Sequence, residues 1–405
     1  MSQVSQKIAN RVLELMRSRR DASAASLTVA SPVAVSVPRL RQVEFDDHLA
    51  IIALKKRWGL IPESHENWEK FWITNPALRD AHTARPMGWV LEADGQLVGY
   101  LGNISSTYFY DERKLTAVTS TGLVVEPAYR SASMTLMAAF YRQKIDINLG
   151  TTAIPAVGKM GMAFKAAPLP QADYDTVLFW VLHPYPFVGA VMKRLELQPL
   201  FARTAGILGS AVLAAERILR RRCPKHTSAA VTVSKIRVEE IGDDFQALWI
   251  QKLKEGLRLF ADRTPETLRW HFSIPGDMGT TNVFCCRRNT ELVGYAIIRT
   301  SINRLNGLRR TLIADMLIKK DDPDVIRSLL IAAYEYAKEL GSDVFEILGF
   351  PENIRKICLE GNPYTRKYPA TPFYYKATDP NLHKAFLDSQ AWYATPFDGD
   401  TTLMP

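Results

Sequence analysis

One order of local signals occurs twice in this 405-residue chain, about 195 residues apart, and it constrains the fold more than any other feature. Each copy contains in turn a helix, two strands joined by a turn, a third strand, a helix rich in Leu and Ala, and a short strand. The first copy covers residues 68–76, 88–101, 120–125, 134–147 and 149–154. The second covers residues 268–275, 282–298, 312–318, 324–340 and 344–348. Agreement at five successive steps predicts two domains of one mixed α/β fold, and a chain of this length typically forms two domains.

Turn-forming residues support the match between the copies. The Asp94-Gly95 dipeptide predicts a tight hairpin turn in the first copy, and Asn289-Thr290 stands at the same place in the second. Gly99 and Gly294 each open the apolar strand that follows. The first helix of each copy closes at a proline, because the residue before a proline is biased away from the helical region.

The predicted layout has four parts. Residues 1–38 are expected to form a short amphipathic helix and a flexible linker, and residues 39–178 the N-terminal domain. Residues 179–232 are expected to form a helical connector, and residues 233–405 the C-terminal domain. The connector carries a long helical pattern with basic residues at its end, which predicts either packing between the two domains or contact with a membrane surface.

The net charge of +9 is concentrated in residues 1–41 and 193–225. Such clusters attract a phosphate-rich cofactor, nucleic acid or an anionic membrane, but they also occur as solvated helix ends. No apolar stretch reaches the roughly 18 residues of a membrane-spanning helix, and the N-terminus lacks the apolar core of a secretory signal. The four cysteines lack metal-ligand spacing, so no metal is expected. The cytoplasm is the expected location, with peripheral membrane contact through the basic connector helix as the alternative.

The segment Val124-Val-Glu-Pro127-Ala-Tyr129-Arg130, together with the order of elements, resembles the GNAT (N-acetyltransferase) superfamily. The resemblance implies two GNAT-like domains in tandem, with acetyl-CoA or another acyl-CoA bound in the first. It places the cofactor along the strand edge of Leu123, Val124 and Val125, as an added strand would lie. It places the pyrophosphate where a helix begins, because free backbone N–H groups and the helix dipole favour phosphate there. The residues of that loop are Arg130, Ser131, Ala132, Ser133, Met134 and Thr135.

Departures from the family pattern limit what the resemblance implies. Family members carry glycines where this chain has Ser133 and Thr135, because glycine lets backbone amides approach the phosphates. Either the two hydroxyls donate to phosphate instead, or the loop has lost its ligand. In the second copy the equivalent stretch, residues 319–324, is acidic and contains Pro323, which removes an amide donor. The second copy is therefore expected not to bind CoA.

Catalytic residues are less clear from the sequence. The tyrosine with which many family members protonate the leaving thiolate is replaced by Val157 in the first copy and Ile357 in the second. Glu126 beside the cofactor strand is one candidate base, and it could equally be a solvated turn residue. Asp315 is the other, because a lone carboxylate in an apolar strand is costly unless it is paired. The alternative for Asp315 is a structural ion pair, with Arg299, Arg309 or Arg310 as the expected partners.

A group of aromatic and basic side chains lies near the C-terminus and predicts either an acceptor groove or a final hairpin that packs on the core. Its members are Tyr364, Arg366, Lys367, Tyr368, Phe373, Tyr374 and Tyr375. Residues 392–400 resemble the tail of tandem GNAT proteins, including the FemAB-type aminoacyl transferases.

The motifs and the resemblance together predict three alternative functions. The leading one is transfer of an acyl group from acyl-CoA to an amine or hydroxyl of a small-molecule, sugar or lipid-linked acceptor, with catalysis by positioning and by a strand amide that polarises the thioester. The second is a FemAB-like transferase that uses aminoacyl-tRNA, the one nucleic acid that the sequence makes a plausible partner. The third is an inactive tandem GNAT that acts as a binding or regulatory protein.

Overall fold

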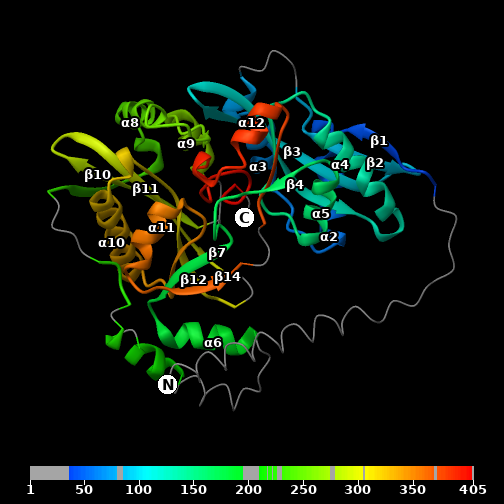
Figure 1. Ribbon diagram of the computed structural model, residues 1–405. Coiled ribbons are helices and arrows are strands. Elements are labelled where there is room, and N and C mark those ends of the chain that lie inside the picture. The colour runs from blue at the N-terminus through cyan, green and yellow to red at the C-terminus, as the bar shows by residue number, and fades with distance from the viewer. Residues whose placement is uncertain are drawn as a thin grey trace. The chain divides into compact units, whose positions relative to one another are not determined.

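Alternating apolar residues and the paired turn signals build two mixed β-sheets with helices between their strands (Figure 1). The structure, a computed structural model, describes residues 36–79, 85–194, 209–216, 218–220, 222–225, 230–273, 279–303, 306–368 and 372–403. The predicted N-terminal helix and nearly all of the linker lie outside these residues, as does much of the predicted connector. Within the described part, no helix is both long and apolar enough to cross a membrane.

The first sheet has the order β1-β2-β3-β4-β5-β15-β6, and β9 adds to β3. Asp94 and Gly95, both at positive φ, form the predicted turn between β2 and β3. The bounds are β1 (Arg39–Gln42), β2 (Gly88–Ala93), β3 (Gln96–Tyr110), β4 (Arg113–Val125), β5 (Ile147–Gly150), β6 (Ala167–Pro168), β9 (Phe260–Ala261) and β15 (Tyr374–Ala377).

The second sheet repeats this order, β8-β10-β11-β12-β13-β7-β14. In each sheet the last long strand pairs antiparallel with its predecessor and parallel with the short strand after the next helix. The bounds are β7 (Thr176–Val181), β8 (Thr232–Ile236), β10 (Thr280–Arg288), β11 (Glu291–Ile302), β12 (Arg309–Ile318), β13 (Val344–Ile347) and β14 (Tyr364–Lys367). The repeat found in the sequence is thus present as two sheets of matching topology.

Each sheet takes strands from the other half of the chain: β9 and β15 join the first sheet, and β7 joins the second. β15, from the second half of the chain, lies between β5 and β6 of the first sheet. β7, from the first half, lies between β13 and β14 of the second sheet. The predicted boundary at residue 178 therefore falls inside β7, and residues 179–181 are strand rather than helical connector.

The same exchange shows that the expected final hairpin is wrong. β14 and β15 follow one another in the chain, yet each pairs in a different sheet, so they cannot form a hairpin with each other.

Helices fill the connections. Ser64 and Thr264 cap the matched helices α3 and α9, each accepting a hydrogen bond from a first-turn amide. The helix expected over residues 134–147 ends earlier, at Tyr141, and Ile147 already begins β5. The bounds are α2 (His48–Arg57), α3 (His65–Trp72), α4 (Ser133–Tyr141), α5 (Pro155–Ala163), α6 (Pro184–Arg194), α8 (Asp243–Leu253), α9 (Pro265–Phe272), α10 (Pro323–Glu339), α11 (Glu352–Leu359) and α12 (Pro380–Ala385).

The largest cluster of buried apolar side chains contains residues from both sheets. Tyr108 and Leu149 of the first sheet share it with Trp180 and Ile313 of the second. The C-terminal segment, residues 392–403, contributes Tyr393 and runs between the two sheets (Figure 1, red). The C-terminal segment therefore belongs to the core. It contacts β4 and β12, the strands in which the sequence placed candidate site residues.

Candidate active site

The last long strand of the first sheet separates from its parallel neighbour half-way along. β4 pairs with β5 only as far as Thr119, which lies opposite Leu149. β4 then continues to Val125 while β5 ends at Gly150, so a V-shaped opening, here the first opening, lies between them. On its other side, where it pairs with β3, β4 has a β-bulge. Gly122, at a φ of +63°, and Leu123 together face the single residue Leu101 there. A bulge leaves a residue unpaired, so the strand edge here has backbone groups available to a ligand.

The predicted cofactor strand lies on this free edge. Val124 is buried, while Leu123 and Val125 are half-buried and pack against the core below α4. Among the described residues, none places a side-chain hydrogen bond on the backbone of residues 122–125. The edge that the sequence assigned to the pantetheine arm thus has no strand partner on the β5 side beyond Thr119.

The predicted phosphate loop is a turn of 3-10 helix, η3 (Pro127–Ala132), that continues into α4. Arg130, Ser131, Met134 and Thr135 are exposed at this corner. The Ser133 hydroxyl donates to the Arg130 carbonyl at 2.6 Å, so it is engaged inside the turn rather than directed to solvent. The residue before α4, Ala132, has no side chain that caps the helix. The first turn of α4 contains no acidic residue, and no side chain of the described residues caps this helix.

The equivalent corner of the second sheet carries its own anion. Asp322 caps α10, and its carboxylate accepts a hydrogen bond from the Asp324 amide at 2.9 Å. Arg288 forms an ion pair with the same carboxylate at 2.9 Å and, with the backbone amides, lowers its pKa against the effect of burial. An internal carboxylate thus sits at the corner that corresponds to the predicted phosphate loop, and the expectation that the second copy binds no CoA stays a prediction.

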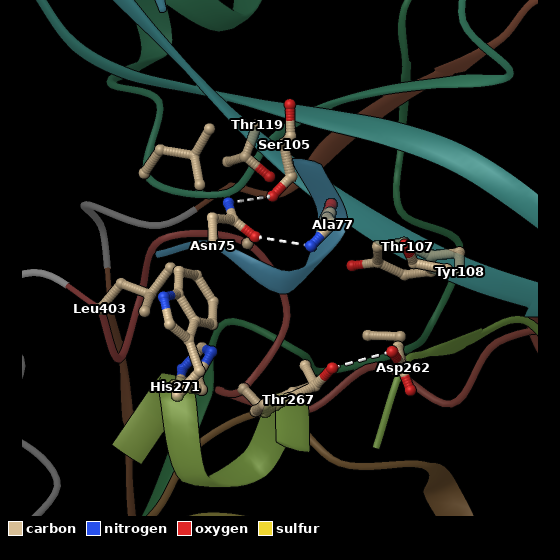
Figure 2. A pocket seen from close by; sticks show the side chains of 16 residues that line it. Asn75, Ala77, Ser105, Thr107, Tyr108, Thr119, Asp262, Thr267, His271 and Leu403 are labelled. Carbon is tan, nitrogen blue, oxygen red and sulfur yellow. Dashed lines mark hydrogen bonds between the residues drawn. The ribbon is translucent and has the colours of Figure 1, made fainter. Parts of the chain in front are cut away.

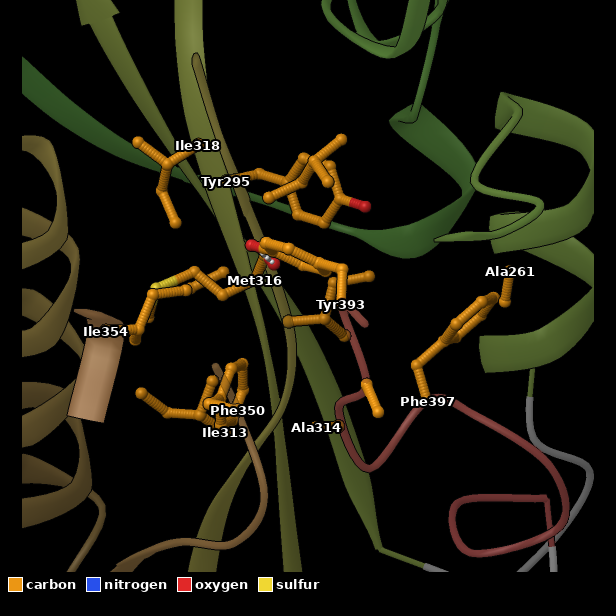
Figure 3. Packing of buried hydrophobic residues seen from close by; sticks show 14 of the residues in the cluster. Ala261, Tyr295, Ile313, Ala314, Met316, Ile318, Phe350, Ile354, Tyr393 and Phe397 are labelled. Carbon is orange, nitrogen blue, oxygen red and sulfur yellow. Dashed lines mark hydrogen bonds between the residues drawn. The ribbon is translucent and has the colours of Figure 1, made fainter. Parts of the chain in front are cut away.

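The second sheet has a matching opening, here the second opening, and the protein fills it. β12 pairs with β13 as far as Ile313 and bulges at Ala314. Tyr393 of the C-terminal segment enters beyond this point and donates from its hydroxyl to the Met316 carbonyl at 2.8 Å. Figure 3 shows the Tyr393 ring among the apolar side chains of this opening, including Phe350. A ligand could pair with this edge only by displacing the C-terminal segment.

Asp315, proposed from the sequence as a catalytic candidate, lies at the base of the second opening and is fully buried. Arg263 contacts it through two nitrogens at 3.0 Å, and Tyr295 and Thr395 donate hydroxyl hydrogen bonds at 3.0 and 2.8 Å. Arg263 was not among the expected partners. Arg299 binds the Thr402 carbonyl, Arg309 the Leu340 carbonyl and Arg310 the carboxylate of Glu346. The geometry favours the structural ion pair over a catalytic role, because all of its contacts are internal.

Glu126, the second candidate, pairs with Arg57 of α2 at 2.8 Å. The pair is partly exposed and lies where β4 turns into η3, next to the predicted cofactor strand. It is placed to tie α2 to the end of β4. Its carboxylate does not line the cavity described next.

A third carboxylate, not singled out from the sequence, closes the base of the first opening. Asp400 accepts hydrogen bonds from the hydroxyls of Thr151 at 2.6 Å and of Thr152 at 3.1 Å, and also from Thr121 of β4. It therefore bridges the two strands where they part. Burial raises the pKa of Asp400, and the three hydroxyls act in the opposite direction. A carboxyl with a raised pKa at a strand opening is poised for proton transfer.

Asp400 lines a cavity of about 460 Å³ that both sheets border, here called the inter-sheet cavity. This volume lies in the range of small-molecule sites. Thr121 and Gly122 bring the free edge of β4 to the cavity, and Arg299 and Glu346 contribute charges from the second sheet. Lys55 also lines it, held by Glu63 at 2.5 and 2.6 Å within a buried pair, and burial lowers the pKa of this lysine. Of the aromatic and basic group predicted from the sequence, Tyr368 reaches the cavity.

A second, much smaller cavity of about 40 Å³ is also lined in part by the C-terminal segment (Figure 2). Thr119, His271 and Leu403 are among the residues around it. The hydroxyls of Thr119 and Ser106 have no hydrogen-bond partner within the described structure, although both are buried. A space of this size, with two buried hydroxyls nearby, suits a water molecule or a group of two or three atoms.

Comparison with known proteins rests on structure alone, since no protein-family model and no curated protein sequence matches the chain. A GCN5-related N-acetyltransferase from Anabaena variabilis superimposes with a TM-score of 0.52 at 11% identity, over 84% of this chain and 73% of that one. A probable N-acyltransferase from Enterococcus faecalis gives 0.54 at 10% identity, over 84% and 72%. The chain has the GNAT fold. Saccharomyces cerevisiae N-myristoyltransferase, solved with myristoyl-CoA and inhibitors, gives 0.51 at 14% identity over 86% and 82%.

Sequence reasoning placed the cofactor edge and the phosphate loop in the first copy from the Val124–Arg130 segment, and that assignment stays a prediction. It missed Asp400 as a site residue. A signal was present, because the tail that contains Asp398-Gly399-Asp400 was linked to tandem GNAT proteins. Nothing local connects that tail to Thr151 and Thr152, which lie about 250 residues away in the chain.

Proposed function

We propose that this chain transfers an acyl group from acetyl-CoA or another acyl-CoA to an amine, at the point where the free edge of β4 meets the inter-sheet cavity. The observation that carries the proposal is the difference between the two openings. The first leaves the β4 edge accessible and borders a cavity, whereas Tyr393 fills the second. The acyltransferases and N-acetyltransferases of the same fold support the chemistry.

The residues of the first opening fit an acyl-CoA. The edge of Leu123, Val124 and Val125 offers backbone groups to an amide-containing arm, and the exposed corner from Arg130 to Thr135 offers a cation and a helix start without a competing carboxylate. An amide of the Gly122–Leu123 bulge is placed to polarise the thioester carbonyl, since a bulge leaves one residue outside the ladder.

Asp400 is the base that we propose for the acceptor. The amine nitrogen attacks the thioester carbon, the carbon–sulfur bond breaks, and the proton lost by nitrogen passes to the Asp400 carboxylate. The thiolate of CoA leaves and takes a proton from solvent, because neither Val157 nor Ile357 can supply one. Asp400 lines the cavity and its pKa is raised, so its basicity exceeds that of an exposed carboxylate.

Calorimetric titration with CoA and acetyl-CoA tests the cofactor site. The sharpest variant is Ala132→Asp, which places a carboxylate at the start of α4, as Asp322 does at α10. We expect this charge to weaken CoA binding at least tenfold by repelling the phosphates, while the matched control Ala132→Asn, of equal size, retains most of the affinity. Equal affinity in both variants would move the pyrophosphate away from this corner. No binding to the native chain would reject the proposal.

The CoA titrations, an acyl-transfer assay and a titration with aminoacyl-tRNA together separate the alternatives predicted from the sequence. An inactive binding protein would take up CoA without transferring its acyl group, or would not bind it. A FemAB-like enzyme would bind aminoacyl-tRNA with an affinity that falls steeply with salt. A sugar or lipid-linked acceptor, a hydroxyl acceptor, and membrane contact through the basic connector stay predictions, to be tested with acceptor panels and vesicle flotation.

A further inference from the structure

The floor of the inter-sheet cavity is a sheet face with unusual chemistry. Arg299 and Ser301 of β11 lie opposite Leu312 and Arg310 of β12, so all four project from one face. Glu346 of β13 lies beside Leu312 on that same face. Central strands of a mixed sheet normally present apolar residues where another layer covers them, because a covered charge loses its water. The charges on this face border the inter-sheet cavity, where a polar ligand would meet them.

The positive charges on this floor outnumber the negative ones. Glu346 is shared by two guanidinium groups, with Arg310 Nε at 2.9 Å and Arg366 Nη2 at 2.9 Å from its oxygens. Arg299 adds a third cation. Its guanidinium donates to the Thr402 carbonyl, and no carboxylate of the described residues lies within ion-pair distance of it. Burial lowers the pKa of Arg299, and no anion counters that effect.

We propose that the inter-sheet cavity binds an amine that also carries an anionic group, a carboxylate or a phosphate, with Arg299 holding the anion and Asp400 facing the amine. The inference rests on the proposed function for the amine end alone. Guanidinium is the side chain best suited to carboxylate and phosphate, since its planar donors match their oxygens in pairs. The C-terminal segment connects both ends, because Asp400 and the Thr402 carbonyl that orients Arg299 are two residues apart.

Anion binding is tested first, without CoA, so that its outcome does not depend on acyl transfer. The full chain is titrated with acetate and with inorganic phosphate, and binding is followed by calorimetry and by the thermal midpoint. We expect Arg299→Gln to lower the affinity for whichever anion the native chain binds more tightly by at least tenfold. The reason is that glutamine still donates to the Thr402 carbonyl but carries no charge. The control Arg113→Gln, at an exposed site paired with Asp146, should bind as the native chain does. Absence of binding, or equal binding by Arg299→Gln, overturns the proposal.

Acceptor choice is tested second, in an acetyl-CoA assay that follows release of the free thiol. Matched amines differ only in the anion: glycine against glycinamide, and O-phosphoethanolamine against ethanolamine. We expect KM to be at least tenfold lower for the charged member of one pair, which identifies carboxylate or phosphate, and the preference to disappear in Arg299→Gln and persist in Arg299→Lys. A preference for the neutral amines overturns the proposal. If no amine is acylated, the proposed function fails, and the anion titration still decides whether Arg299 forms a binding site.

Discussion

Arg263 and Asp315 form a fully buried ion pair in which both Nε and Nη2 of the arginine lie 3.0 Å from carboxylate oxygens. Tyr295 and Thr395 donate to the same carboxylate, so every charge in the pair is countered inside the protein. Thr395 belongs to the C-terminal segment, which means that the pair fixes this segment against β12 at the base of the second opening. A buried pair of this kind becomes strongly destabilising when one partner is removed.

We therefore expect Asp315→Asn to lower the free energy of unfolding by about 3–5 kcal/mol, because Arg263 loses its closest counter-charge and is left with Asp398 at 3.7 Å. Urea denaturation followed by fluorescence measures the change. Glu352→Gln, which removes an exposed pair with Lys356, serves as the control and should cost less than about 1 kcal/mol. Folded Asp315→Asn protein should retain its acyl transfer. Loss of activity without loss of stability would restore Asp315 as a catalytic candidate.

A neighbouring carboxyl predicts an unusual pH dependence of stability. Burial raises the pKa of Asp398 to about 6, while Arg263 acts in the opposite direction. In the unfolded chain the pKa is about 3.9, so between pH 4 and 6 the folded state holds more protons than the unfolded state. The contribution of Asp398 is therefore fully present below about pH 4 and is lost as the pH rises through about 6.

The loss amounts to at most about 3 kcal/mol, from about two pH units at 1.36 kcal/mol each. Asp398→Asn removes this titration. Between pH 4.5 and pH 7.5 the native chain should therefore lose more unfolding free energy than the variant does. Denaturant unfolding at the two pH values measures it. A difference that is independent of pH would show that Asp398 does not titrate in this range.

Local signals in the sequence were sufficient for the elements of the repeat. The hairpin signal at Asp94-Gly95 acts within a few residues, and the apolar periods mark β4 and β12. These interactions are short-range, so the local amino-acid sequence specifies them directly. The GNAT fold followed from the same local order, whereas the assignment of the cofactor to β4 stays a prediction.

The strand exchange could not be found in this way. β7 and β15 are six and four residues long, and their local sequences specify strand but not the sheet in which each pairs. The partner of Asp315 was missed for a related reason. Arg299, Arg309 and Arg310 are near it in sequence, whereas Arg263 is 52 residues away and approaches only once α9 packs. Asp400 likewise acquires its role from Thr151 and Thr152, far away in the chain.

Asp400→Asn tests the proposed base. The amide keeps the shape and can still accept from Thr151, but it cannot take a proton, so we expect kcat to fall by about 10²–10⁴ with little change in CoA affinity. In the native chain, activity should decline as the pH falls through the raised pKa of Asp400, above the range of an ordinary carboxyl. Steady-state rates from pH 5 to 9 measure this limb, which should be absent from the residual activity of the variant. An unchanged profile in Asp400→Asn would assign the proton to another group.

The strand exchange predicts that neither half of the chain folds alone. A fragment of residues 1–200 lacks β15, which leaves β5 and β6 without their shared neighbour, and it carries β7 with no sheet to join. A fragment of residues 201–405 lacks β7 between β13 and β14. Unpaired strand edges and an incomplete core promote aggregation, so each fragment alone should give no cooperative unfolding transition. Expressed together, the fragments should associate and unfold in one transition close to that of the intact chain. Two independently folded, monomeric fragments would instead mean that each domain is complete without the strand of the other.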